Sequence, residues 1–314
     1  MTPPLIKPRA LRPGATLAIV SPASATKPEL VERGVAHLRR LGYKTVLGSH
    51  ALDSGPLYYA GKLEDRLQDF HAAFANPEVD GVICTRGGWG SAELLPYLDA
   101  ALIHSNPKPF IGYSDHTSLH CWLHREANLV TFYGPMAAAD FSRDDGPELP
   151  SWQHSLTGDT AWSLRTAEGL RVLRAGRAEG VVTGGCLSIF AEALGTPYAP
   201  RIEKDSILFL EDIGTKPYQW DRMLLHLRYA GILEKVTGIV FGDMGQNVSP
   251  EETEYLERAI LHSLGQFDGP IGIGLRCGHV STYNVTLPLG VSARLDLTEP
   301  RNPQMHLLEA AVSG

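Results

Sequence analysis

The sequence has few cysteines and no pattern that would pair them. Cys84, Cys121, Cys186 and Cys277 are scattered along 314 residues, and no two have the C-x-x-C spacing of a redox or zinc motif. Cys84 lies inside an apolar stretch that is typical of a buried strand. We therefore expect reduced, mostly buried thiols and no disulfide framework, as is usual in a reducing cytoplasm.

Long apolar runs and clusters of positive charge are also missing. No stretch approaches the roughly 18 apolar residues that a membrane-spanning helix needs, and the first residues lack the apolar segment of an export signal. A net charge of -7 without any basic run argues against nucleic acid as the main partner. We expect a cytoplasmic protein with no membrane and no nucleic-acid partner.

The length of the chain predicts two domains. At 314 residues, with 43% hydrophobic and 20% charged residues, it exceeds what one ordinary core needs. The apolar rhythm is lost from residue 137 to about residue 177. We therefore predict a first domain at 1–150, a linker or irregular segment at 151–176, and a second domain at 177–314.

Strand-like and helix-like patterns alternate through the first domain. Strands are expected at 16–20, 44–47, 80–85, 109–112 and 129–133, and helices at 31–41, 63–75 and 116–126. Such alternation predicts an α/β fold with a doubly wound parallel sheet, whose ligands bind at the carboxyl ends of the strands. The second domain has short apolar runs at 180–182, 207–210, 238–241, 271–274 and 291–297, and helices at 218–229 and 251–264. This pattern predicts a strand-rich, mixed α+β domain.

Ser114 lies on a predicted bend between a strand and a helix. The apolar residues 109–112 precede it, and Asp115 and Thr117 are residue types that commonly open a helix. A hydroxyl at such a bend points out of the sheet, near free backbone N–H groups and the positive end of the helix dipole. That position suits a nucleophile, although a simple helix cap explains the same residues.

A serine nucleophile needs a base, and the base needs a carboxylate to orient it. Glu211 and Asp212 follow a buried strand that starts at residue 206, and His279 lies on a loop after the strand at 271–274. Glu211 stands at the carboxyl end of its strand. Taken singly, each acid also fits a surface position and the histidine a structural role.

A glycine-rich turn at 86–90 follows the strand that precedes the one leading to Ser114. Gly87 and Gly88 let backbone N–H groups approach a ligand, as an oxyanion hole or as a phosphate cradle, and a plain tight turn is the alternative. The turn matches neither G-x-G-x-x-G nor a Walker motif, so no dinucleotide cofactor is expected.

Three histidines, His116, His120 and His124, recur every four residues on one predicted helix face. The spacing suggests a metal site, but no carboxylate is interleaved as in H-E-x-x-H, and a long row of ligands diverges from a single ion. We therefore expect a packed or solvated polar face and no metal.

Taken together, these stretches resemble the LD-carboxypeptidase family of serine peptidases. The matching motifs lie at 14–22, 86–91, 111–117, 183–185, 208–213, 218, 221–222, 278–279 and 286–290. The resemblance implies Ser114 as nucleophile, His279 as general base and Glu211 as the residue that orients the histidine. It also implies an oxyanion hole from backbone N–H groups of Gly88 and Asp115. The remaining expected substrate contacts are Arg86, Gly87 and Trp89.

The resemblance also implies a flavodoxin-like first domain, a homodimer, no cofactor and a murein peptide as partner. The expected reaction is hydrolysis of an L,D peptide bond, which releases terminal D-alanine from a murein tetrapeptide in cell-wall recycling. Hydrolysis of a microcin-C-like peptidyl-nucleotide and non-catalytic binding of a peptide or phosphosugar remain alternatives. The chain departs from the family pattern at Cys186, where asparagine is common, at Thr215 and Lys216, near which a glutamate is common, and at 275–277, which lack a proline.

Overall fold

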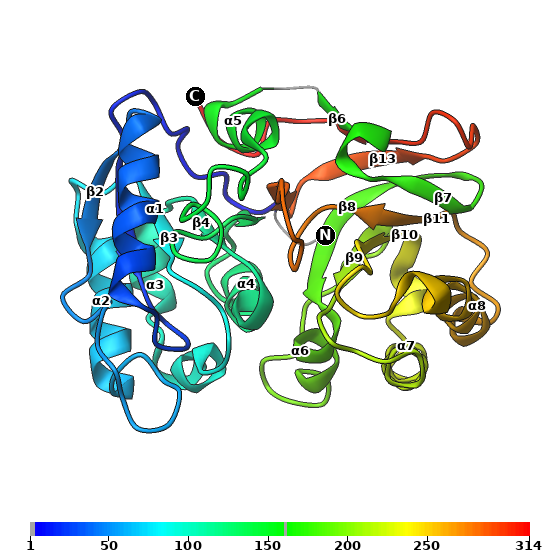
Figure 1. The fold of residues 1–314 in the computed structure, drawn as a ribbon, viewed down its shortest axis with the longest axis horizontal. Helices are drawn as coiled ribbons and strands as arrows, with labels where there is room; N and C mark the ends of the chain where they lie inside the picture. The colour runs from blue at the N-terminus through cyan, green and yellow to red at the C-terminus, as the bar shows by residue number, and fades with distance from the viewer. Residues whose placement is uncertain (1–3, 160–161) are drawn as a thin grey trace.

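The computed structural model describes residues 4–159 and 162–314, which form two sheets (Figure 1). In spatial order the first sheet contains β12 (Leu287–Leu289), β5 (Thr131–Tyr133), β4 (Phe110–Gly112), β3 (Gly81–Cys84), β1 (Thr16–Val20) and β2 (Lys44–Leu47). Strands β1 to β5 are parallel, and β12 joins β5 in the antiparallel direction. The spatial order β2-β1-β3-β4-β5 confirms the predicted doubly wound sheet.

Helices connect the parallel strands of the first sheet. They are α1 (Pro28–Arg40), α2 (Leu63–Ala75), the 3-10 turn η1 (Ser91–Tyr97), α3 (Ala100–Ser105), the 3-10 turn η2 (Ser114–His116) and α4 (Thr117–Arg125). Helix α2 has the bounds that its sequence predicts, because Phe70 and Phe74 recur at helical spacing on its buried face. Within the described residues, no helix is both long and apolar enough to cross a membrane.

The second sheet is mixed, as the sequence predicts. Its spatial order is β6 (Trp162–Leu164), β14 (Gln304–Leu307), β13 (Ser292–Asp296), β8 (Arg177–Cys186), β9 (Ser206–Glu211), β10 (Val236–Gly242), β11 (Ile271–Leu275) and β7 (Arg171–Arg174). Strands β8 to β11 are parallel, and the outer strands pair in the antiparallel direction. The accompanying helices are α6 (Leu187–Glu192), α7 (Pro217–Tyr229), α8 (Thr253–Leu264), η3 (Thr166–Glu168), η4 (Leu233–Lys235) and η5 (Pro250–Glu252).

The segment 151–176 is not the irregular linker that we expected. Most of α5 (Leu149–Thr157) lies in it, followed by β6 and β7, which pair with β14 and β11; residues 160–161 lie outside the description. These strands are short, and partners far away in the sequence hold them in place, so local periodicity does not reveal them. Trp152 and Leu156 in α5 are fully buried. Their spacing of four residues is the feature of the sequence from which this helix could have been predicted.

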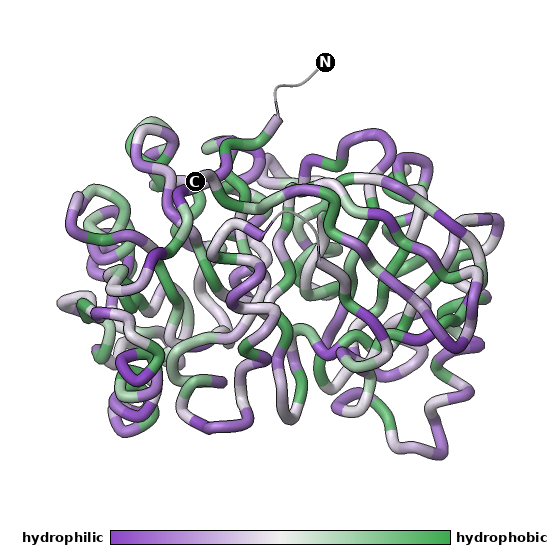
Figure 2. The backbone as a smooth tube through the Cα atoms, turned by 90° about the horizontal axis from the view of Figure 1, so that it is seen from above, coloured by the Kyte–Doolittle hydropathy of each residue, from purple (hydrophilic) through white to green (hydrophobic). Residues whose placement is uncertain are grey.

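The two sheets share one apolar interior. The larger buried cluster includes Leu17 and Ile83 from the first sheet together with Val182 and Leu295 from the second. A second cluster lies between the second sheet and helices α7 and α8, around Trp220. In Figure 2, hydrophobic stretches run through the interior, and hydrophilic ones are frequent along the outer helices and loops. All four cysteines are free and buried, as predicted.

Candidate active site

Ser114 lies where the chain turns from β4 into η2 and α4. Its φ is +67°, a left-handed conformation that non-glycine residues rarely adopt. Such strain persists where the surroundings hold the backbone in place, and it is frequent at functional sites. The bend directs the hydroxyl out of the carboxyl end of the sheet, which is the placement expected from the sequence.

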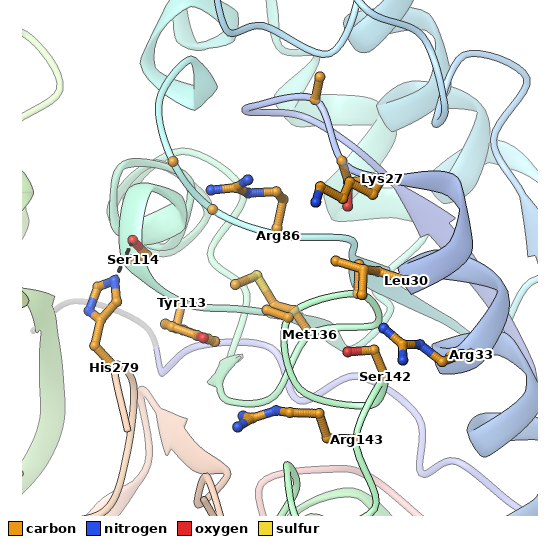
Figure 3. Close-up of a pocket in the computed structure, with 16 residues that line it drawn as sticks. Lys27, Leu30, Arg33, Arg86, Tyr113, Ser114, Met136, Ser142, Arg143 and His279 are labelled. Atoms are coloured by element: carbon orange, nitrogen blue, oxygen red, sulfur yellow. Dashed lines mark hydrogen bonds between the residues drawn. The ribbon is translucent and has the colours of Figure 1, made fainter. Parts of the chain in front are cut away.

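Ser114, His279 and Glu211 form a continuous hydrogen-bonded relay. Ser114 Oγ lies 2.9 Å from His279 Nε2, and His279 Nδ1 lies 2.8 Å from Glu211 Oε2. Glu211 has no proton to give, so Nδ1–H is the donor to the carboxylate and Nε2 accepts from the serine hydroxyl. The first of these contacts is the dashed line in Figure 3.

The loop that carries His279 reaches Glu211 because Gly278 permits a close approach. Gly278 has φ +95°, and a Cβ built there would lie 2.4 Å from the Glu211 carboxyl carbon. The backbone N–H of His279 donates to the same Glu211 oxygen at 3.0 Å. After this loop the chain returns to the first sheet as β12, so the histidine is fixed between the two sheets.

Tyr133 links the two halves of the relay and is a residue that sequence reasoning missed. Its hydroxyl donates to Glu211 Oε1 and accepts the backbone N–H of Ser114 at 3.0 Å. The Ser114 N–H is therefore occupied and is not available to a substrate. The sequence could have indicated this residue, because a tyrosine with a polar hydroxyl ends the predicted strand 129–133, and that strand was expected in the same sheet as the one leading to Ser114.

Buried charges around His279 change its protonation. Burial is the largest single effect and lowers the pKa of His279, but the charge and hydrogen bond of Glu211, with Asp212 and Asp140, raise the pKa above its usual value overall. Burial also raises the pKa of Asp140 to about 6, although this carboxylate accepts hydrogen bonds from Met136 N and Asn284 Nδ2. The ring of Tyr113 packs edge-on against His279 at 5.3 Å.

The glycine turn lies directly against the serine. A Cβ on Gly87 would lie 2.7 Å from Ser114 Cβ, and one on Gly88 would lie 2.4 Å from Ser24 Oγ. Gly88 also has φ +107°, so both positions require glycine. Ser24 Oγ accepts the Trp89 N–H at 3.0 Å and fixes the turn on its other side.

The three spaced histidines hold backbone and side-chain groups rather than facing solvent. His116 Nε2 bonds to Arg86 O at 3.0 Å, His120 Nε2 bonds to Gly112 O at 2.9 Å, and His124 Nε2 bonds to Thr131 Oγ1 at 2.9 Å. Burial lowers the pKa of His116 and His124 to about 3 and that of His120 to about 4. Neutral, buried histidines therefore tie α4 to the strand ends and to the glycine turn.

Ser114 and His279 open into a cavity of about 730 Å³, shown in Figure 3. Arg86, Gly87 and Gly88 are among the residues that line it. Trp89 is not one of them, and its side chain is 40% exposed beside the turn. The Asp115 carboxylate also points elsewhere, since it is buried and accepts the Ser91 N–H at 2.8 Å. The volume lies in the range of small-ligand sites.

A serine hydrogen-bonded to a histidine, which is itself hydrogen-bonded to a carboxylate, beside a ligand-sized cavity is the arrangement of a hydrolase. Family models support a specific class: the LD-carboxypeptidase N-terminal domain matches residues 17–134, and the LD-carboxypeptidase C-terminal domain matches residues 179–295. The chain belongs to the LD-carboxypeptidase family of peptidases.

Individual relatives resemble the chain over nearly its whole length. A probable murein peptide carboxypeptidase of Bacillus subtilis is 35% identical over 311 residues, which cover 98% of this chain and 95% of the relative. The crystal structure of a muramoyltetrapeptide carboxypeptidase from Oxalobacter formigenes is 30% identical, with a TM-score of 0.83 over 94% of this chain and 99% of that one. MccF in complex with glutamyl sulfamoyl guanosine is 25% identical, with a TM-score of 0.90 over 98% and 100%.

Chelator treatment tests whether the same residues hold a metal instead. The ligand atoms of Cys186, Glu211 and His279 lie within 4.8 Å of one another. Burial, with Glu211 and Asp212 nearby, raises the pKa of the Cys186 thiol well above its usual value, which disfavours the thiolate that a metal needs. We expect that prolonged EDTA treatment leaves kcat/KM for peptide hydrolysis unchanged. We expect the same of the Cys186→Ser variant. Loss of activity to EDTA and recovery with zinc would contradict this expectation.

Proposed function

We propose that this protein is a serine carboxypeptidase that hydrolyses an L,D peptide bond and releases terminal D-alanine from a murein tetrapeptide. The observation that supports this most directly is the hydrogen-bonded relay. Ser114 Oγ lies 2.9 Å from His279 Nε2, and Glu211 lies 2.8 Å from the other ring nitrogen, at the wall of a ligand-sized cavity. The relatives named as murein peptide carboxypeptidases support the substrate class.

In acylation, Ser114 Oγ attacks the scissile carbonyl carbon while His279 Nε2 takes the hydroxyl proton. The imidazolium that forms donates from Nδ1 to Glu211, whose negative charge stabilises it. His279 then gives the proton to the leaving amine, so D-alanine departs and an acyl-enzyme remains. In deacylation His279 activates a water in the same way, and the shortened peptide leaves with a new carboxylate.

The negative oxygen of the tetrahedral intermediate needs backbone donors, and we assign this role to Gly88 and Asp115. No acceptor within the described residues takes the Gly88 N–H, and the turn that carries it lies against Ser114. Asp115 is in the first turn of η2, where backbone N–H groups point away from the helix. Ser114 itself cannot serve, since its N–H bonds to Tyr133.

The structural likeness to MccF favours a second candidate, hydrolysis of a peptidyl-nucleotide. Base binding would need an aromatic surface. Trp220 cannot supply one, because it is fully buried and packs edge-on against Phe241 at 5.8 Å. Trp89 is partly exposed but lies outside the cavity lining. Neither tryptophan therefore gives the cavity a stacking surface for a nucleobase, and the aromatic residue that lines it, Tyr113, packs edge-on against His279.

Mass spectrometry of murein peptides tests the proposal. We expect the tetrapeptide to lose one alanine, and the tripeptide and pentapeptide to stay intact, because the cavity must place an L,D bond one residue from the carboxyl terminus. A peptidyl sulfamoyl nucleotide serves as the competing substrate. Cleavage of that compound with an intact tetrapeptide would favour the second candidate instead.

The oligomeric state is proposed from the family resemblance, and the location from the four free, buried thiols. We propose a cytoplasmic homodimer. Light scattering on the purified full chain measures the oligomeric state and should give the mass of two chains. Fractionation of the producing cells measures the location and should recover the protein in the cytoplasmic fraction.

A further inference from the structure

The cavity beside Ser114 is strongly cationic. Within the described residues no aspartate or glutamate lines it, whereas four basic side chains do: Lys27, Arg33, Arg86 and Arg143. Figure 3 shows them around the cavity, with Lys27, just before α1, and Arg33, within α1, on the side away from His279. A wall of one charge sign attracts ligands of the opposite sign.

Most of these cations have no anionic partner in the protein. Among the described residues, neither Lys27, Arg33 nor Arg86 forms an ion pair. Arg143 only approaches the buried Asp140, at 4.0 Å. By contrast, Arg40 on the same helix, outside the cavity, pairs with Asp144 at 2.8 Å. Lys27, Arg33 and Arg86 are therefore free to bind an anion from a ligand, whereas the Arg143 guanidinium already donates to Ser281 O.

The first turn of α1 adds one backbone donor, the Glu29 N–H, because Pro28 has no N–H and those of Leu30 and Val31 donate to Lys27 O. Lys27 is the N-cap residue, Pro28 follows it, and no side chain caps the turn. Thr26 is among the residues that line the same cavity, and its Oγ1 is buried without a hydrogen-bond partner in the described part of the chain. An uncapped helix N-terminus is a favourable place for a carboxylate.

The chemistry of a carboxypeptidase decides which part of the substrate reaches α1. Only one residue leaves, so the leaving side of the site is one residue long, and the rest of the cavity must hold the acyl side. Arg86 adjoins Gly87 and Gly88 at the nucleophile and suits the terminal carboxylate of the leaving residue. Lys27 and Arg33, across the cavity, then face the part of the peptide before the scissile bond.

We propose that the unpaired side chains of Lys27 and Arg33 form a carboxylate subsite for the acyl side of the substrate. This rests on the proposed function, and it narrows the substrate class to peptides that carry a free carboxylate before the scissile bond. The free α-carboxylate of a γ-linked D-glutamate and the second carboxylate of diaminopimelate have the required chemistry. Amidated peptides are then poor substrates.

A matched pair of substrates tests the subsite: a murein tetrapeptide with free carboxylates before the scissile bond, and the same peptide with those carboxylates amidated. We expect the wild-type kcat/KM to be about 10-fold or more higher for the free acid, because a hydrogen bond to a charged group contributes at least that much. Lys27→Gln and Arg33→Gln should bring this ratio toward one, by raising KM for the free acid alone.

Arg39→Gln is the matched control, since it removes the same charge from the same helix at a residue whose side chain bonds to Thr45 outside the cavity. It should keep the wild-type ratio. Equal rates on both peptides in the wild type, or an unchanged ratio in both cavity variants, would overturn the subsite and leave the proposed function intact.

Absence of cleavage of either peptide would instead refute the proposed function. In that case calorimetry with the wild-type chain still decides the subsite, with the free-acid and amidated tripeptides as ligands. Binding of the free acid about 10-fold tighter or better supports it. Equal binding, or no binding of either, refutes it.

Discussion

Replacing Ser114 or His279 by alanine lowers kcat/KM for the murein tetrapeptide by a factor on the order of 10⁴ to 10⁶, and the double variant loses little more than either single one. Both residues act in one proton transfer, because Ser114 Oγ and His279 Nε2 are 2.9 Å apart. Once either is gone the other has no function to lose. Activity of the purified single and double variants, measured by release of alanine, checks the result.

Ser142→Ala is the matched control, since Ser142 lines the same cavity without belonging to the relay. It should keep most of the activity. Thermal unfolding of each variant separates loss of chemistry from loss of fold, because the Ser114 backbone is in a left-handed conformation and is sensitive to its surroundings. Losses that add in the double variant would mean that the two residues act independently, which would contradict a shared proton transfer.

The parts of the fold that the sequence predicted are those that local patterns specify. Helix α2 begins and ends where its apolar spacing predicts, and the Ser249 N–H donates to the Glu252 carboxylate at 3.2 Å, which is one of the two bonds of the predicted capping box. Strand β5 is shorter than the expected 129–133, because its ladder pairing begins at Thr131, opposite Leu289 of β12. The ends of β3, β4 and β9 were also predicted, and they carry the glycine turn, the serine and the glutamate.

The rest depends on contacts between residues far apart in the sequence. Strand β12 contains Pro288, forms the edge of the first sheet and pairs with β5, so its three residues are stable only as an addition to a sheet formed much earlier in the chain. Because β12 follows the loop that carries His279, its pairing with β5 holds this loop close to Ser114. Tyr133 shows its function only when β5 stands beside β4 and faces Glu211 across the sheets. No local periodicity encodes these approaches.

The departures from the family pattern lie beside the relay rather than in the cavity wall. Cys186 stands opposite Glu211 in the pairing of β8 with β9, and its N–H donates to Thr117 Oγ1 at 2.9 Å. Thr215 is buried and its N–H donates to Asn247 Oδ1 at 2.9 Å. Neither lines the cavity. Both bonds are made by backbone N–H groups, which other residues at these positions would also donate, and the charge of the cavity is set by other residues.

Glu211→Gln should lower kcat/KM by a factor on the order of 10² to 10⁴, less than removal of the serine, because nucleophile and base remain. The carboxylate accepts from three donors: the Tyr133 hydroxyl and both the backbone N–H and Nδ1–H of His279. Both oxygens of the carboxylate accept hydrogen bonds, but a glutamine has only one oxygen. Its NH₂ group must therefore face one of these donors, and this contact misorients the histidine.

The pH dependence of kcat/KM shows how much of the loss in Glu211→Gln comes from removing the negative charge beside His279. Activity needs neutral His279, so kcat/KM rises with pH as the histidine loses its proton. Glu211 raises the pKa of His279 in the native enzyme, against the opposing effect of burial. Removing the negative charge lowers that pKa, so the acid limb of the profile in Glu211→Gln should move to lower pH while the maximum falls.

Asp212→Asn is the control that can contradict this choice of carboxylate. Asp212 is also buried, but its oxygens accept the backbone N–H groups of Ser188 and Ile213, both at 2.8 Å. An asparagine there disturbs the start of α6 and should cost stability, with a smaller loss of kcat/KM and a small shift of the acid limb. If Asp212→Asn loses more activity than Glu211→Gln in equally folded proteins, then Asp212 orients the histidine and Glu211 only supports it.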